Sequence, residues 1–420
     1  MARALRAAAA AALGLLGLAA LAFLYVMFVP PFDGASAAEN PPRPPLPPAG
    51  ENAWTEYSEA LADLRRERDP GALTHLRAGA SRSRFAYFRD SPTVTTPVPD
   101  LRALRQLAEL AAAEARRLGE AGDGAGALEL ETAAYRYGTD LAQLDAGLLL
   151  PITAAGCRRT AAAALFASLG RDAPAPAFAR AARAVAEEDA RMPSAWQATA
   201  SEWRLMRRTV EDRFLGPNDG SAGPRAFRRR VFGSFLAQHD AALDEARPLL
   251  ESWDFSGLEH LDERLLPALQ SRASPWRSVW FVDNTAARMV AGMVAPFGRP
   301  ARLLYVDRAN GAAFQFLAAC RAYQLAHGRF PPDPRDALTE AGLAWPSDPV
   351  GGRPIGLRLE AGAAAAWLAG FDGTDDGGRV PYLDLLQATI TPGSDLVYHL
   401  GELPPTLRSL AATASARPGP

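Results

Sequence analysis

Lysine is missing from this chain of 420 residues, so all 45 of its basic side chains are arginines. Without lysine the phosphate-binding loop GxxxxGK[ST] cannot be present, and no GxSxG motif marks a serine nucleophile. The arginines face 47 aspartates and glutamates, which gives a formal net charge of −2. A general nucleic-acid binder usually carries a strong basic excess. We therefore expect neither a P-loop nucleotide hydrolase nor a nucleic-acid-binding protein.

Cysteine and histidine are also scarce, with two cysteines, Cys157 and Cys320, and five histidines. A structural zinc site needs four closely spaced ligands, and no histidine stands in HExxH or another metal-binding spacing. Both cysteines lie in apolar helical stretches. Two interpretations stay open for them: two separate buried thiols, or one disulfide in a compartment outside the cytoplasm.

Charged residues are absent from residues 7–29 (AAAAAALGLLGLAALAFLYVMFV). An apolar helix of this length spans the roughly 30 Å hydrocarbon core of a bilayer. Because Arg3 and Arg6 precede it, the positive-inside rule predicts a single-pass protein of the inner membrane, with its N-terminus in the cytoplasm and the remainder outside. We predict a transmembrane anchor over residues 1–30. The alternative is a signal peptide cleaved near residues 35–37 (ASA), although its apolar core is usually only about 7 to 15 residues long.

Proline is dense over residues 40–50 (NPPRPPLPPAG). This composition favours an extended polyproline II rod, which holds a domain off the membrane as a semi-rigid spacer. We therefore predict a proline-rich linker over residues 31–50. The alternative is a ligand for an SH3-type domain, although a stalk beside an anchor needs no such partner.

Helical periodicity dominates residues 51–299, where apolar side chains recur at three- and four-residue spacings. Asp100 is a predicted N-cap, and Gly119 or Gly122 is a predicted stop for the helix that follows it. Helix pairs joined by glycine turns resemble tetratricopeptide hairpins, but the 34-residue period is not repeated. We predict an irregular α-helical domain that contains a long loop over residues 69–99.

Two charged clusters in this domain admit a functional and a structural interpretation. The basic stretch RAFRRRVF (residues 225–232) suits anionic lipid or an acidic partner, or else begins a helix whose arginines pair with nearby acids. Glu187, Glu188 and Asp189 are consecutive, so on a helix they point around its circumference and not at one substrate. Neither cluster identifies a catalytic site.

Residues 300–402 have the pattern of a small α+β module. A long helix ends at Gly328, prolines follow it, and residues 348–352 (DPVGG) form a turn signal. The short strands IGLRLE, AAAAWLAGF and DLVYHL then predict a β-meander. Residues 403–420 are predicted to be a loose tail. The predicted fold class is mainly α, with a transmembrane helix, an irregular α-helical domain and this C-terminal module.

This module resembles the C-terminal part of the type II secretion major pseudopilins. The matching pieces are YQLAHGRFP (residues 323–331), DPVGGRP (residues 348–354) and GFDGTDDGG (residues 370–378). The ending SDLVYHL is also similar to membrane-anchored proteins of planctomycetes and myxobacteria that combine an anchor, a helical middle and such a module. The start MARALRAAAAAALG lacks a prepilin peptidase site, so we interpret the resemblance as a shared small module.

The resemblance implies a calcium-binding loop, for which Asp372, Asp375 and Asp376 are the candidate ligands. Calcium prefers six to eight oxygen ligands, often from closely spaced aspartates. However, the EF-hand order is not kept, and Leu383 stands where its bidentate glutamate belongs. The alternative is a glycine-rich turn whose aspartates cap their own backbone. No nucleophile or base accompanies the loop, so we do not expect it to be catalytic.

Anchor, linker and helical domain together predict a membrane-anchored scaffold or protein-binding protein of the bacterial envelope. Its predicted contacts are the membrane, through residues 7–29, and a protein partner in the envelope. The alternative is an envelope enzyme, such as a hydrolase, whose active site the sequence does not mark. Calcium is the only cofactor that the sequence predicts.

Overall fold

The computed structural model describes residues 46–87, 96–210, 240–271, 296–360, 362–378 and 395–401. The chain divides into two compact units. The larger unit holds residues 41–205, 246–262 and 296–420, and so includes most of the described elements. The predicted anchor, the basic stretch at residues 225–232 and the predicted tail lie outside the described residues, as does most of the linker.

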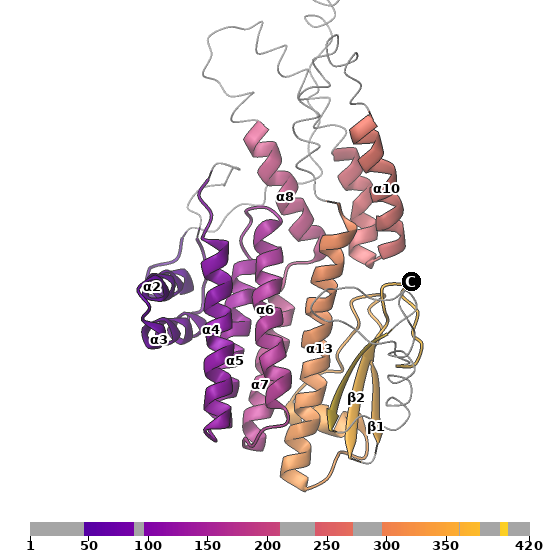
Figure 1. Ribbon diagram of the computed structural model, residues 1–420. Coiled ribbons are helices and arrows are strands. Elements are labelled where there is room, and N and C mark those ends of the chain that lie inside the picture. Colours follow the sequence, from indigo (N-terminus) through magenta and orange to yellow (C-terminus); the bar gives the residue numbers. More distant parts are fainter. Residues whose placement is uncertain are drawn as a thin grey trace, which may run out of the picture. The chain divides into compact units, whose positions relative to one another are not determined.

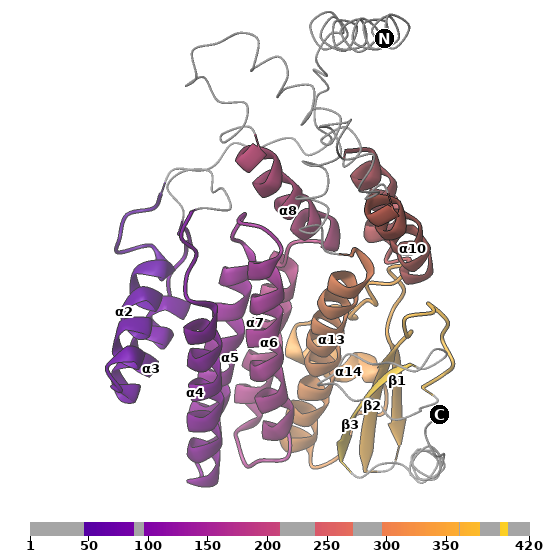
Figure 2. The same cartoon turned by 45° about the horizontal axis from the view of Figure 1, so that its top comes forward.

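A helical hairpin begins the described part of the larger unit (Figures 1 and 2). It consists of α2 (Ala53–Arg65) and α3 (Asp69–Ala80). The prediction of a loop from residue 69 was therefore wrong over α3. Its helix begins with a proline in the first turn and buries Leu73 and Leu76 on one face. Gly79 lets α3 approach α2 closely, because a Cβ atom there would lie 2.3 Å from the ring of Tyr57.

Four further helices form the centre of this unit. They are α5 (Gly124–Ala142), α6 (Leu149–Ser168), α7 (Ala175–Arg191) and α13 (Gly298–His327). Each packs on two of the others in the order α5, α6, α13, α7 and back to α5, which is the arrangement of a four-helix bundle. The helix α4 (Leu101–Glu120) packs outside, on α5 and α6.

The predicted ends of α4 and α13 are confirmed. Asp100 is the N-cap of α4, and its side chain accepts hydrogen bonds from the amides of Arg102 and Ala103. Gly122, which has a φ of +87°, follows the end of α4. Gly328 caps α13 in the left-handed conformation with a φ of +69°.

The helix α13 is shared between the bundle and a small antiparallel sheet (Figure 1). The predicted β-meander is confirmed: β1 (Gly356–Glu360) pairs with β2 (Ala363–Leu368), and β2 pairs with β3 (Leu396–Gly401). The short helix α14 (Pro334–Ala341) also packs on α13. Tyr398 of β3 donates a hydrogen bond to Asn310 of α13 at 2.9 Å and stacks on Phe166 of α6. A mainly helical fold with a three-stranded C-terminal sheet is therefore what the structure shows.

Three more helical segments are described: α8 (Ala195–Val210), residues 240–252 and α10 (Phe255–Ser271). Among the helices that the structure describes, none has both the length and the apolar character needed to cross a membrane. The charge-free run at residues 7–29 is not among them.

The two cysteines are separate buried thiols, as one of the two interpretations predicted. Cys157 lies on α6 and donates to the carbonyl of Leu104 at 3.7 Å, while Cys320 lies on α13. Burial raises the pKa of Cys157 to about 12, so its thiol stays protonated and unreactive near neutral pH.

Candidate functional site

The acidic loop follows β2, and its aspartates bind neighbouring backbone amides. Asp372 accepts a hydrogen bond from the amide of Thr374 at 3.0 Å, and Asp375 accepts one from the amide of Gly377 at 2.8 Å. Both are Asx turns, in which a short carboxylate caps the backbone two residues on. Gly373, Gly377 and Gly378 have positive φ angles, which explains the glycines between the aspartates.

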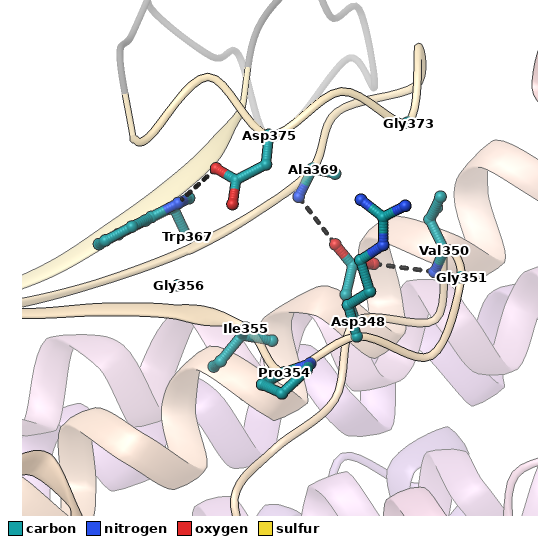
Figure 3. Close-up of a pocket in the computed structure, with 11 residues that line it drawn as sticks. Asp348, Val350, Gly351, Pro354, Ile355, Gly356, Trp367, Ala369, Gly373 and Asp375 are labelled. Atoms are coloured by element: carbon teal, nitrogen blue, oxygen red, sulfur yellow. Dashed lines mark hydrogen bonds between the residues drawn. The ribbon is translucent and has the colours of Figure 1, made fainter.

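Trp367 of β2 fastens this loop to the sheet (Figure 3). Its indole Nε1–H donates to Oδ1 of Asp375 at 2.9 Å. The ring lies over Gly356 of β1, where a Cβ atom would come within 1.9 Å of it, and also approaches Gly378. The guanidinium of Arg358 lies 5.1 Å from the indole centroid and donates to the carbonyl of Gly377. Trp367 and Arg358 therefore hold the loop against the sheet as a closed turn.

Asp395, directly before β3, holds the far end of the loop. Its carboxylate accepts from the amides of Asp376 at 3.3 Å and Gly378 at 2.8 Å, and only 1% of the residue is exposed. Burial raises the pKa of Asp395 despite these hydrogen bonds. Asp395 therefore connects the end of the acidic loop to the start of β3.

Asp348 organises the predicted turn at residues 348–352 and joins it to two other elements. Its carboxylate accepts from the amide of Val350 at 2.8 Å, the amide of Ala369 at 2.8 Å and the hydroxyl of Tyr305 at 3.2 Å. Figure 3 shows the bonds of Asp348 to Val350 and Ala369. Tyr305 belongs to α13, so this one buried side chain connects the turn, the end of β2 and the long helix. Burial raises the pKa of Asp348, and the three donors oppose that rise.

A small hollow lies between this turn and the acidic loop (Figure 3). Its volume is about 70 Å³, and its polar lining comes from Asp348, Arg353, Trp367 and Asp375. None of the described residues that line it is a serine, cysteine or histidine. The hollow can therefore bind a group by hydrogen bonds, but these residues supply no nucleophile and no imidazole base.

The second polar centre of the molecule lies inside the four-helix bundle. Arg158 of α6 is fully buried, and its Nε–H is shared by the two carboxylate oxygens of Asp307 on α13, at 3.0 and 2.8 Å. The rest of its guanidinium donates to groups on α5 and α7: Thr139, Tyr135 and Asp189. Burial raises the pKa of Asp307, and the attraction of the paired guanidinium of Arg158 opposes that rise and favours the ionised carboxylate. Every helix of the bundle contributes to this cluster, and the arginine at its centre is fully buried.

Two further ionic groups in the larger unit also connect helices. Tyr57 of α2 donates to Asp140 of α5 at 2.8 Å, and Arg191 of α7 donates to the same carboxylate at 2.6 Å. On the other side of α5, Ser168 donates to Glu131 at 2.8 Å. Burial raises the pKa of Glu131 to about 7. These groups stabilise packing between helices.

The consecutive acids at residues 187–189 do point around α7, as predicted. Glu187 is exposed, Glu188 pairs with Arg191 at 2.7 Å, and Asp189 joins the cluster around Arg158. Sequence reasoning missed the role of Asp189. The sequence does hold one sign of a close contact, the glycine Gly311 in the middle of α13. A Cβ atom at this position would lie 2.0 Å from the Asp189 carboxylate.

The described geometry around the three candidate calcium ligands is that of a capped turn. Among the described residues, no three histidine, cysteine, aspartate or glutamate side chains are grouped so that they could hold a metal ion. Oδ1 of Asp372 and Oδ1 of Asp375 each accept backbone amides. The side chain of Asp376 has no hydrogen bond to another described residue, so it is the carboxylate most available to an ion.

Comparison with known proteins adds no family to this description. The chain matches no protein-family model, no curated protein and no solved structure.

Proposed function

We propose that this chain is a membrane-anchored scaffold of the bacterial envelope that binds a partner protein outside the cytoplasm. The proposal rests on one observation: the buried charged side chains of the larger unit bind groups on neighbouring helices. Arg158, Asp307 and Asp140 bind groups on neighbouring helices and leave no reactive centre among themselves. A body fixed in this way presents a pre-ordered surface, which lowers the entropic cost of binding.

The proposed topology rests on the sequence before the described residues. The charge-free residues 7–29 hold the chain in the inner membrane, and the prolines of residues 31–50 space the helical body from it. The N-terminus is cytoplasmic in this proposal, because Arg3 and Arg6 precede the apolar run.

Affinity capture from detergent-solubilised membranes tests the proposal. The bait is the tagged full chain, and the control bait carries residues 1–50 ahead of an unrelated soluble domain. We expect at least one protein to be enriched reproducibly by the full chain over the control. Recovery of the same proteins by both baits would contradict a binding role for the body.

Calcium binding by Asp372, Asp375 and Asp376 is a separate proposal, supported by the resemblance to pseudopilins. The carboxylate oxygens that do not cap the turns would coordinate the calcium ion. Its test is the melting temperature of the full chain in calcium and in chelator, because an ion that binds only the folded state raises stability. A rise that Asp376→Ala abolishes supports the ion, and an unchanged melting temperature ends the proposal.

A further inference from the structure

Two polar groups in the hollow of the C-terminal module have unused hydrogen-bonding capacity. Arg353 lines the hollow, and its exposed guanidinium makes no hydrogen bond or ion pair within the described part of the chain. Asp375 uses Oδ1 for both of its hydrogen bonds, from Trp367 and from Gly377, so Oδ2 accepts none from the described residues. Figure 3 shows one carboxylate oxygen of Asp375 bonded to the indole and the other turned away from it. The hollow therefore offers a donor and an acceptor that do not pair with each other.

The size of the hollow limits what can occupy it. A single water needs about 10–15 Å³ of such space, while pockets for drug-sized ligands have about 300–1,000 Å³. At about 70 Å³, the hollow admits a few waters or the end of one side chain. A nucleotide, a sugar or an organic cofactor does not fit.

The charges around the hollow select among side-chain ends. The carboxylate of Asp348 is already bound by three donors, which leaves Arg353 and Asp375 as the groups to be matched. A carboxylate would be attracted by Arg353 but repelled by Asp375, and an ammonium or guanidinium would be attracted by Asp375 but repelled by Arg353, so neither charged end gains from both groups. A carboxamide carries an acceptor and two donors without net charge, so it matches both groups at once.

We propose that this hollow binds the side-chain carboxamide of an asparagine or glutamine on a partner protein. The amide carbonyl accepts from the guanidinium of Arg353, and the amide NH₂ donates to Oδ2 of Asp375. This inference rests on the proposed function, because a scaffold supplies the partner that carries the amide. In this proposal the partner contacts the turn at residues 348–352 and the acidic loop of the C-terminal module.

Small probes test the chemistry of the hollow without a partner. Propionamide stands for the side-chain amide, N-methylacetamide for a main-chain amide, and propionate and propylammonium for charged ends. The readout is the NMR signal of the Trp367 indole N–H in the full chain in detergent micelles, assigned by its loss in Trp367→Phe. We expect propionamide to shift this signal saturably and to bind at least several-fold more tightly than the other three probes.

Two substitutions remove one half of the site each. Arg353→Met removes the donor, and Asp375→Asn replaces the free acceptor by a donor while it keeps an oxygen for Trp367. Because hydrogen bonds to charged groups contribute roughly 1.5–3 kcal/mol, we expect each change to weaken propionamide binding roughly tenfold or more. The matched control is Arg329→Met, since Arg329 is an exposed arginine of the same module outside the hollow, and it should leave binding unchanged.

Three results would overturn the proposal: no saturable shift with propionamide, equal binding of propionate, or full binding in Arg353→Met. Tighter binding of N-methylacetamide would replace a side-chain amide by a main-chain one and so contradict the proposal as stated. These outcomes do not depend on the capture experiment. If capture recovers a partner while propionamide does not bind, the scaffold stands and this site fails.

Discussion

Glu131 of α5 is buried, and its Oε2 atom has no hydrogen-bond partner among the described residues, while Oε1 accepts from Ser168. The guanidinium of Arg171 lies 3.8 Å from Oε1. Burial outweighs both and raises the pKa of Glu131 from 4.5 to about 7. In the unfolded chain the same carboxyl titrates near its ordinary value, so the folded state holds its proton to a higher pH.

The sign of the resulting pH dependence follows from this difference. Between about pH 4.5 and pH 7 the folded state binds more protons at Glu131 than the unfolded state, so the free energy of unfolding falls as the pH rises. We predict that the stability of Glu131→Gln relative to the natural chain grows by up to about 3 kcal/mol between about pH 4 and pH 8. Denaturant unfolding at several pH values measures this. Exposed Glu187→Gln is the control, and a difference that does not change with pH would contradict the prediction.

Arg158 is fully buried in the bundle and pairs with Asp189 and Asp307. Arg158→Met removes the counter-charge of Asp307 and leaves that carboxylate buried without an ion pair. Breaking a buried pair from one side costs about 3–5 kcal/mol, and we predict a loss of unfolding free energy in that range. The double variant Arg158→Met, Asp307→Asn should lose less than the sum of the two single changes. If the losses of the two single variants simply add up in the double variant, as measured by chemical unfolding, the direct pairing of Arg158 with Asp307 would be contradicted.

Little of this residue-scale chemistry could be predicted from the sequence. The pattern places Arg158 and Asp307 on helices, but they are separated by 149 positions, and periodicity does not show which faces meet. The acids at residues 187–189 illustrate the limit. Their directions around the helix follow from 3.6 residues per turn, whereas the partner of each depends on tertiary packing.

At the scale of elements, the sequence predicted well the features that depend on only a few neighbouring residues. The N-cap Asp100, the end of α13 at Gly328 and the turn at Asp348 depend on local hydrogen bonds and on glycine at positive φ. The helix α3 was missed because its 12 residues include two glycines, which lower helix propensity. Its packing against α2, for which Gly79 makes room, overrides that propensity.

The meander depends on a glycine that a strand would otherwise disfavour. In Gly356→Ala the new Cβ would lie 1.9 Å from the ring of Trp367, so the indole must move and its bond to Asp375 must lengthen or break. We predict a loss of about 1–3 kcal/mol in unfolding free energy. The opposite case is Gly156→Ala on α6, where nothing lies within 4 Å and a gain of about 0.5–1 kcal/mol is expected. Equal effects in thermal melts would contradict the close packing at Trp367.

For the whole molecule, composition and pattern predicted a mainly helical chain with a C-terminal meander, and the structure confirms both. The hollow could not be foreseen, because Arg353 and Asp375, the two polar groups with unused hydrogen-bonding capacity, come from different turns that only the folded sheet brings together. The helix α13 was predicted as part of the module alone. In the structure it also completes the four-helix bundle, since Asp307 meets Arg158 there and Tyr305 meets Asp348 two residues earlier.

Site-specific photo-crosslinking in living cells tests the central claim, that a partner protein binds at the C-terminal module. A photoreactive phenylalanine replaces Thr374, an exposed residue between two that line the hollow, and for comparison Arg116, an exposed residue of α4. We predict a discrete crosslinked product from position 374 that is weakened by Arg353→Met, and none from position 116. No product at position 374, or the same product from both positions, would contradict the account.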